Sequence, residues 1–300
     1  MQLTYVKQKV DTYQTIYDIL KQEFKLSNRL LLKIKKAEKI SLNGNFARSW
    51  FPVKVGDLVC VNLDFDEISE NIVPTSIPLS ILYEDEAFLI LDKPAGIPVH
   101  PSILHFETSL SNGVRFYYEQ CGLKRKIHPV NRLDKNTSGI VIFAKNEFIQ
   151  EDCIRQMQSG SFKKEYLAIC EGHLNIPVGT ISAPITRKEG SIIEREINFE
   201  TGSKAITHYE VLENLELESK PYSLVKCELE TGRTHQIRLH FAFLNHPLLG
   251  DDLYGSASLL LPRQALHAFQ IKLLHPITKE ELIINSPLPY DMQSIIKVNL

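Results

Sequence analysis

Cysteine is scarce in this chain of 300 residues, and it is spread too widely to build a site. The five cysteines form no Cys-x-x-Cys pair and no cluster with histidine, so the sequence predicts neither a disulfide framework nor a bound metal such as zinc. Scattered cysteines without a pairing pattern are typical of proteins in a reducing compartment. The chain also lacks an apolar run long enough to span a bilayer, and its first residues lack the apolar core of a signal peptide. We therefore expect a cytoplasmic protein that does not contact a membrane.

The chain also has little net charge, because the formal total is only -2. The charge is unevenly distributed, however. Residues 1–62 contain eleven lysines and arginines against five acidic residues, which leaves this segment at +6 and the remainder at -8. A local basic face is what matters for contact with phosphate groups, so the near-neutral total does not exclude a nucleic acid as partner.

The basic amino-terminal segment has the pattern of a small α/β unit. Residues 15–39 are predicted to form two helices that are broken near Ser27 and Asn28, either of which can cap the second helix. An Asn43-Gly44 turn then predicts a hairpin, and a strand is expected within residues 53–61. Four cations of the second helix fall beside its apolar face: Lys25, Arg29, Lys33 and Lys36. This basic face either binds phosphate groups or is an ordinary solvated helix surface.

Residues 64–78 differ in composition from the sequence on both sides. Four acidic residues are followed by Pro74 and Pro78, without a helical or strand period. We interpret this segment as a linker between an amino-terminal domain of residues 1–63 and a larger domain of residues 79–300. Within the larger domain, the loop that contains Lys124, Arg125 and Lys126 is expected to be exposed to solvent.

The larger domain is organised around the stretch from Asn131 to Gly139. The run that follows, residues 140–144, is apolar and β-branched, which predicts a strand buried on both faces. Asp134 therefore lies on a turn just before a core strand, and a turn anchored to rigid structure is a good mount for a reacting group. The same pattern also fits an ordinary polar turn that leads into a strand.

Resemblance to a known family favours the first interpretation. Arg132-Leu133-Asp134 with Thr137-Ser138-Gly139 resembles the central motif of the RluA-type pseudouridine synthases, although Asn131 stands where that family has histidine. The Lys-Pro-x-Gly stretch at residues 93–96 and the Lys-x-Tyr-x-Ala stretch around Tyr166 are similar to further motifs of the family. A third motif is nearly complete at residues 232–238, followed by Gly250 to Gly255. Thr234 is expected to cap the helix that carries Arg238.

The resemblance implies isomerisation of uridine to pseudouridine in RNA, without a cofactor. It implies that Asp134 supplies the reacting carboxylate, that Arg238 pairs with it, and that Tyr166 contacts the target base. It also implies RNA contacts for residues near the cleft, namely Arg132, Asn131, Arg233 and His235. The implied fold is α+β, with a mixed, largely antiparallel sheet and a cleft where the motifs meet.

The amino-terminal segment resembles the S4 RNA-binding domain, through its two helices, Asn-Gly turn and last strand. An S4-like domain joined to this catalytic type favours ribosomal RNA as the substrate by analogy, with transfer RNA as the alternative. A monomer is expected. A different class stays open, namely a non-catalytic RNA-binding or ribosome-assembly protein. A zinc deaminase is disfavoured, because the sequence has no His-x-Glu with Pro-Cys-x-x-Cys.

Overall fold

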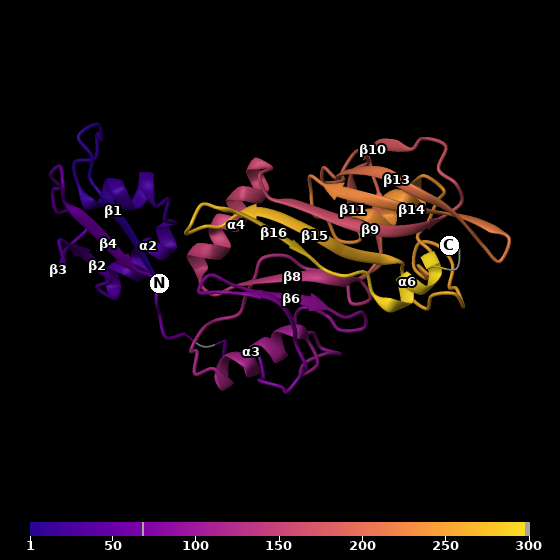
Figure 1. The fold of residues 1–300 in the computed structure, drawn as a ribbon, viewed down its shortest axis with the longest axis horizontal. Helices are drawn as coiled ribbons and strands as arrows, with labels where there is room; N and C mark the ends of the chain where they lie inside the picture. Colours follow the sequence, from indigo (N-terminus) through magenta and orange to yellow (C-terminus); the bar gives the residue numbers. More distant parts are fainter. Residues whose placement is uncertain (68, 298–300) are drawn as a thin grey trace.

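A small amino-terminal unit lies at one end of the elongated molecule in the computed structural model, which describes residues 1–67 and 69–297 (Figure 1). Its antiparallel sheet has four strands: β1 (Gln2–Val6), β2 (Ile40–Leu42), β3 (Asn45–Phe46) and β4 (Leu58–Asn62). Beside the sheet lie α1 (Ile16–Asp18), the π-helical η1 (Ile19–Glu23) and α2 (Asn28–Lys36). The hydroxyl of Ser27 caps α2 by accepting a hydrogen bond from the Leu30 amide at 3.1 Å, which confirms the predicted helix break.

A ten-stranded sheet forms the framework of the remaining chain. Its strands are β5 (Ser80–Glu84), β6 (Phe88–Lys93), β7 (His128–Pro129), β8 (Ser138–Ala144), β9 (Lys163–Glu171), β10 (Val178–Ser182), β13 (Ile206–Leu217), β14 (Lys220–Leu229), β15 (Leu266–Leu274) and β16 (Glu281–Asn285). The main order is β10-β13-β14-β9-β15-β8-β6-β5, with β16 beside β15 and β7 beside β8. In the described residues, β8 and β15 pair in parallel and the other neighbours pair antiparallel. The predicted α+β class and largely antiparallel sheet are confirmed.

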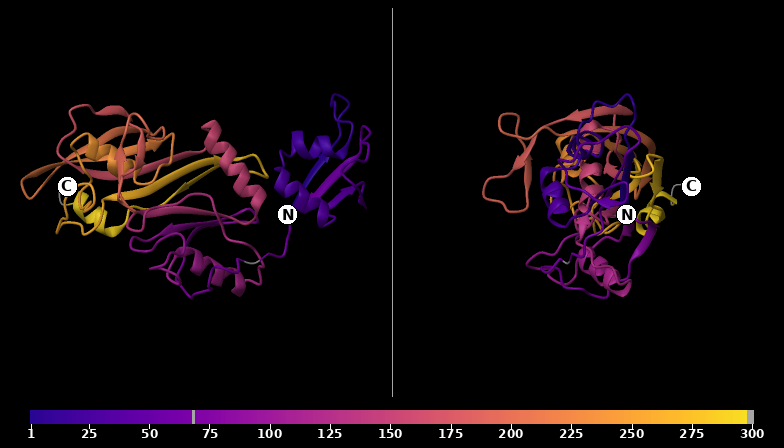
Figure 2. Two further views of the ribbon diagram at one scale, coloured as in Figure 1. Left: turned by 180° about the vertical axis from the view of Figure 1, so that it is seen from behind. Right: turned by 90° about the vertical axis from the view of Figure 1, so that its left-hand side faces the viewer.

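Helices cover both faces of the sheet around β8. Helix α3 (Leu110–Gln120) packs on the face that carries Val141 and Phe143, whereas α4 (Glu147–Ser159) packs on the face of Ile140 and Ile142. Figure 2 shows the two helices on opposite sides of β6 and β8. The predicted strand that is buried on both faces is therefore confirmed. The shorter elements are β11 (Ile185–Arg187), β12 (Arg195–Ile197), α5 (Gln236–Phe243) and α6 (Tyr290–Lys297). No helix within the described residues is long and apolar enough to cross a membrane.

The parallel pairing of β8 with β15 explains the glycine that ends the Asp134 turn. Ser138 pairs with His267 and Gly139 pairs with Ala268. Gly139 has φ +107°, and a Cβ atom built on it would lie 2.2 Å from the carbonyl oxygen of Ala268. Only glycine permits both this backbone conformation and this close approach. The turn that carries Asp134 is thus seated directly against the centre of the large sheet.

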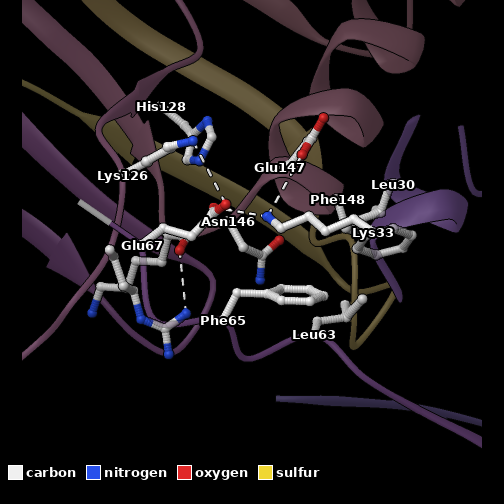
Figure 3. Close-up of a pocket in the computed structure, with 12 residues that line it drawn as sticks. Leu30, Lys33, Leu63, Phe65, Glu67, Lys126, His128, Asn146, Glu147 and Phe148 are labelled. Atoms are coloured by element: carbon white, nitrogen blue, oxygen red, sulfur yellow. Dashed lines mark hydrogen bonds and ion pairs between the residues drawn. The ribbon is translucent and has the colours of Figure 1, made fainter. Parts of the chain in front are cut away.

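Two acidic residues after β4, Asp64 and Glu67, form the junction between the two sheets, and Figure 3 shows Glu67 with Lys33 and Lys126. Glu67 pairs with Lys33 of α2 at 2.7 Å and with Lys126 at 3.6 Å, and Asp64 pairs with Arg125 at 3.0 Å. The prediction that Lys124, Arg125 and Lys126 are all exposed is therefore wrong, because Arg125 and Lys126 are half-buried and their cations contact these carboxylates. The predicted linker holds the amino-terminal unit against the larger sheet through ion pairs.

Candidate active site

The turn that carries Asp134 is fixed from several directions. The amide of Thr137 donates to the Asp134 carbonyl at 3.1 Å, which closes the turn. The side chain of Asn131 donates to the carbonyl of Ile140 and accepts from the amide of Ile142, each at 2.9 Å. The side chain of Asn131 therefore makes the two hydrogen bonds that the backbone of a neighbouring strand would otherwise make to this part of β8. The residue that departs from the family motif braces the turn, and both polar atoms of its side chain are used for this.

A buried lysine supports the other side of the turn. The ammonium group of Lys93, at the end of β6, donates to the carbonyls of Pro94, Ile97 and Lys135 at 2.8 to 2.9 Å. Burial, together with the charge of Arg263, lowers the pKa of Lys93 to about 7, whereas its three carbonyl partners satisfy the charged form. Because Lys135 directly follows Asp134, Lys93 fixes the backbone at the point from which the carboxylate projects.

Arg238 joins Asp134 to a buried carboxylate. Its Nη1 atom lies 3.3 Å from Oδ2 of Asp134, while its Nε and Nη2 atoms each donate to Asp251 at 2.7 Å. Asp251 is fully buried, and its Oδ1 atom also accepts from the amides of Leu253 and Tyr254. Burial opposes the charge of Arg238, but the two carboxylates outweigh it and raise the pKa of this guanidinium. Asp251 therefore orients Arg238 and leaves one edge of it for Asp134.

The helix that carries Arg238 begins one residue later than predicted. Its N-cap is His235, in the left-handed conformation at φ +60°, so the prediction of Thr234 as the cap is wrong. Gln236 explains the difference, because its Oε1 atom accepts from the Arg233 amide and the Thr231 hydroxyl and ties the preceding loop to the helix. The positive end of α5 consequently lies near Asp134, where it favours negative charge.

His235 lies between Asp134 and Tyr254. Its Nδ1 atom is 2.9 Å from the Tyr254 hydroxyl, and its Nε2 atom is 3.8 Å from Oδ2 of Asp134. Burial is the main cause that lowers the pKa of His235; the charge of Asp134 opposes this shift, whereas the charges of Arg238 and Arg195 support it. The histidine is thus neutral at pH 7, and its ring forms a polar side of the site next to the carboxylate of Asp134.

The opposite wall is largely apolar. Tyr166 of β9 lines a small cavity together with Asp134, Leu229 and Leu266. Burial and the charge of Asp134 raise the pKa of the Tyr166 phenol, so the ring is neutral. A flat, uncharged ring beside a carboxylate can hold a planar heterocycle in contact with a reacting group.

This cavity opens into a cleft of about 1170 Å³ that is rich in cations. Five basic side chains line it: Arg132, Lys164, Arg187, Arg195 and Arg233. Asp134 and Glu230 are the acidic residues among its lining residues. The positive charge of such a cleft attracts a polyanion, and Asp134 is among its lining residues.

The structure separates the predicted site residues into two groups. One group surrounds the cleft or the cavity that opens into it: Asp134, Tyr166, Arg238, Arg132, Asn131, Arg233 and His235. The other group, on the amino-terminal unit, comprises Lys25, Arg29, Lys33 and Lys36. Lys25, Arg29 and Lys36 are exposed, although Arg29 also contacts Glu147 of α4 at 3.1 Å. Lys33 is half-buried and lies 3.9 Å from Glu147.

Sequence reasoning did not identify Asp251, Tyr254, Lys93, Arg187 or Arg195 as parts of the site. The first three belong to stretches that resemble family motifs, so a signal for them was present. Arg187 and Arg195 lie on the short strands β11 and β12, where no sequence pattern indicates that they face the cleft. Their position depends on how that ribbon packs over the large sheet.

Comparison with known proteins agrees with this geometry. Residues 87–243 match the family model for RNA pseudouridylate synthases. The chain is 39% identical over 276 residues to YjbO, an uncharacterized RNA pseudouridine synthase of Bacillus subtilis (strain 168), which covers 92% of this chain and 96% of that protein. It is 36% identical over 247 residues to the ribosomal large subunit pseudouridine synthase D of Blochmanniella floridana, which covers 77% and 75% of the two chains. The solved structure of human RNA pseudouridylate synthase domain containing 1 is similar, with a TM-score of 0.58 and 27% identity over 72% of this chain and 86% of that one.

Proposed function

The chain belongs to the RluA-type family of RNA pseudouridine synthases, and on that premise we propose that it isomerises uridine in ribosomal RNA with Asp134 as the reacting carboxylate. The observation that carries this proposal is the position of Asp134. It lies at the inner end of a basic cleft, 3.3 Å from Arg238 and beside the ring of Tyr166. Arg238 supplies a counter-charge for this carboxylate, the basic cleft can bind phosphate groups, and the ring of Tyr166 can contact a base.

The reaction requires the bond between N1 of uracil and C1′ of the ribose to break. The base then turns, a bond forms between C5 and C1′, the hydrogen on C5 leaves as a proton, and N1 takes up a proton, so that the product is an isomer of uridine. Asp134 must be ionised to take part, and the Nη1 atom of Arg238 and the positive end of α5 both favour its charged form.

The detached base must be held while it turns. Tyr166, Leu229 and Leu266 offer flat and apolar contacts around the carboxylate. Arg132 is exposed in the cleft two residues before Asp134, where its planar guanidinium can take the place that the extruded nucleotide leaves. Extrusion of a nucleotide costs a few kcal/mol, and these stacking contacts offset that cost.

Ribosomal RNA is the substrate that the relatives favour. The relative from Blochmanniella floridana and several others that match this chain carry the name ribosomal large subunit pseudouridine synthase D. The amino-terminal unit, which we propose is an S4-like RNA-binding domain of residues 1–63, carries a charge of +6 through residue 62. A second contact of this kind suits a large and structured RNA.

The test of the substrate is a map of pseudouridines in a strain that lacks this protein. We expect at least one uridine of ribosomal RNA to stay unmodified in that strain. The wild-type gene should restore the modification, and a gene that encodes Asp134→Asn should not. Loss of a pseudouridine from transfer RNA instead would show that transfer RNA, and not ribosomal RNA, is the substrate. A map that is the same with and without the protein would refute the proposal.

Replacement of two exposed lysines of the basic group, Lys25 before α2 and Lys36 at its end, should weaken RNA binding. We expect Lys25→Ala with Lys36→Ala to lower the slope of log affinity against log salt by about 1.5, because each lost phosphate contact removes roughly 0.7 to 0.9. The measurement is RNA affinity at several salt concentrations. The matched control is Lys25→Arg with Lys36→Arg, which keeps both charges and should keep the slope. An unchanged slope in the alanine variant would contradict an RNA-binding role for this face.

A further inference from the structure

A second surface with the chemistry of an RNA site lies on the amino-terminal unit. There, a cavity of about 300 Å³ is formed between the end of α2 and the segment that follows β3. Its lining residues are Lys35, Glu38, Ile40, Phe46, Ala47, Arg48, Ser49 and Trp50. Trp50 is the only tryptophan of the chain. None of these residues belongs to the cleft around Asp134.

The backbone of this segment is well fixed, although its largest side chains face solvent. The Ala47 amide donates to Ile40 of β2, and the carbonyl of Ser49 accepts from the Tyr17 amide of α1. Ala47 and Ser49 are buried, whereas Phe46 and Trp50 are 52% and 64% exposed. Full burial of a large aromatic side chain is worth roughly 2 to 3 kcal/mol, so the fold leaves part of this stabilisation unused at two positions that line the same cavity. Exposed aromatic residues on a rigid support are typical of a binding surface.

The charge around the aromatic side chains favours a polyanion. Arg48 and Lys35 are exposed at the cavity, and among the residues that the structure describes no carboxylate lies within ion-pair distance of either cation. Glu38 is the one acidic side chain in the lining. Lys35 also lies above the ring of Tyr17, with its Nζ atom 5.1 Å from the ring centre. Exposed aromatic residues alone would suit a protein partner. Aromatic residues that share a surface with cations lacking a carboxylate partner among the described residues suit a nucleotide better.

We propose that this surface binds an unpaired nucleotide of the RNA substrate, whose base stacks on Trp50 beside Phe46 while Arg48 and Lys35 contact the neighbouring phosphates. The inference rests on the proposed function, because it assumes that the partner is RNA. It goes further by assigning, within the amino-terminal unit, an aromatic surface that takes one unpaired base and is separate from the catalytic cleft. Because a paired base cannot expose its face in this way, the surface selects for a single-stranded segment.

Fluorescence of Trp50 tests the proposal directly in the full-length protein. A single-stranded oligouridylate should quench the tryptophan emission in a saturable manner, and an RNA duplex of equal length should quench it less at equal occupancy. Occupancy is measured separately by the anisotropy of labelled RNA. Unchanged tryptophan emission at saturating oligouridylate would overturn the proposal.

Variants at the same position give an independent result. We expect Trp50→Ala to weaken binding of the oligouridylate by about 5- to 150-fold, the fold-change that corresponds to the loss of one stacked base. Trp50→Phe keeps an aromatic face and should retain most of the affinity. A thermal unfolding temperature close to that of the wild type would show that the amino-terminal unit is intact in each variant. The matched control is Tyr290→Ala, which removes an 84% exposed aromatic side chain from α6 at the other end of the molecule. Equal affinity of Trp50→Ala and wild type would overturn the proposal and leave the surface to a protein partner.

Failure of this inference differs from failure of the proposed function. If Trp50 is not quenched by RNA but the protein still forms pseudouridine, only the second contact is wrong. If Trp50 is quenched but no pseudouridine forms on any RNA, the proposed function is wrong and the RNA-binding surface stands.

Discussion

Replacement of Asp134 by asparagine is expected to abolish pseudouridine formation while RNA affinity stays within about twofold of wild type. Asparagine has almost the same shape and can still accept a hydrogen bond from Nη1 of Arg238, so the turn should keep its conformation. The five cations of the cleft, which supply most of the attraction for phosphate groups, are unchanged. Only the negative charge and its reactivity are lost. We expect the rate to fall by at least about a thousandfold, as for other residues that act directly on the reacting atoms.

The measurement is the rate of pseudouridine formation in a single turnover with excess protein, together with RNA affinity on the same preparation. Asp252→Asn is the matched control, because Asp252 is an exposed carboxylate next to the buried Asp251. It should leave both quantities unchanged. Residual activity of Asp134→Asn near the wild-type rate would remove Asp134 from the mechanism.

Replacement of Asp251 by alanine should have a large effect on both stability and turnover. The side chain of Arg238 is 6% exposed, and Asp251 supplies two of its three described carboxylate contacts. The variant leaves a buried guanidinium without its main partner, which costs about 3–5 kcal/mol in free energy of unfolding. Arg238 also loses the contacts that orient it toward Asp134, and a misplacement of about 1 Å lowers the rate by about a hundredfold.

Denaturant unfolding and single-turnover rates separate these two effects. Asp251→Asn keeps the volume and one set of hydrogen bonds, so it should fold better than Asp251→Ala and still turn over slowly. The matched control is Glu281→Ala, which breaks the solvent-exposed pair between Lys272 and Glu281 at 2.7 Å. An exposed pair contributes at most about 1 kcal/mol, so this control should be nearly as stable and as active as wild type. Equal losses in the two alanine variants would contradict a special role for the buried pair.

Local sequence patterns predicted those parts of the fold that depend on local chemistry. The run at residues 140–144 and the cap at Ser27 are examples, because periodicity and capping act within a few residues. Resemblance to the family brought Asp134, Tyr166 and Arg238 into one site before their positions were known. Membership in the RNA pseudouridine synthase family argues against the alternative of a non-catalytic RNA-binding protein.

The rest depends on contacts between residues that are far apart in the sequence. The sequence predicts that Asn131 contacts RNA, and Asn131 does line the cleft. The sequence does not show that its side chain also pairs with the backbone of β8, because this pairing depends on the packing of the turn. Lys33 was expected on a free basic face, yet it lies 2.7 Å from Glu67 and 3.9 Å from Glu147. The helical period indicates that Lys33 points away from the core of its own unit. It does not indicate which other unit packs there.

The most direct test of the central claim is tritium release from RNA that carries tritium on C5 of uridine. RNA from a strain that lacks this protein is incubated with the purified wild-type protein, and RNA from the parent strain serves as the comparison. We predict release from the first RNA and little from the second, whose target uridines are already isomerised and have lost their tritium. No release from either RNA, under conditions in which the protein binds both, would contradict the assignment of this chain as an enzyme that isomerises uridine.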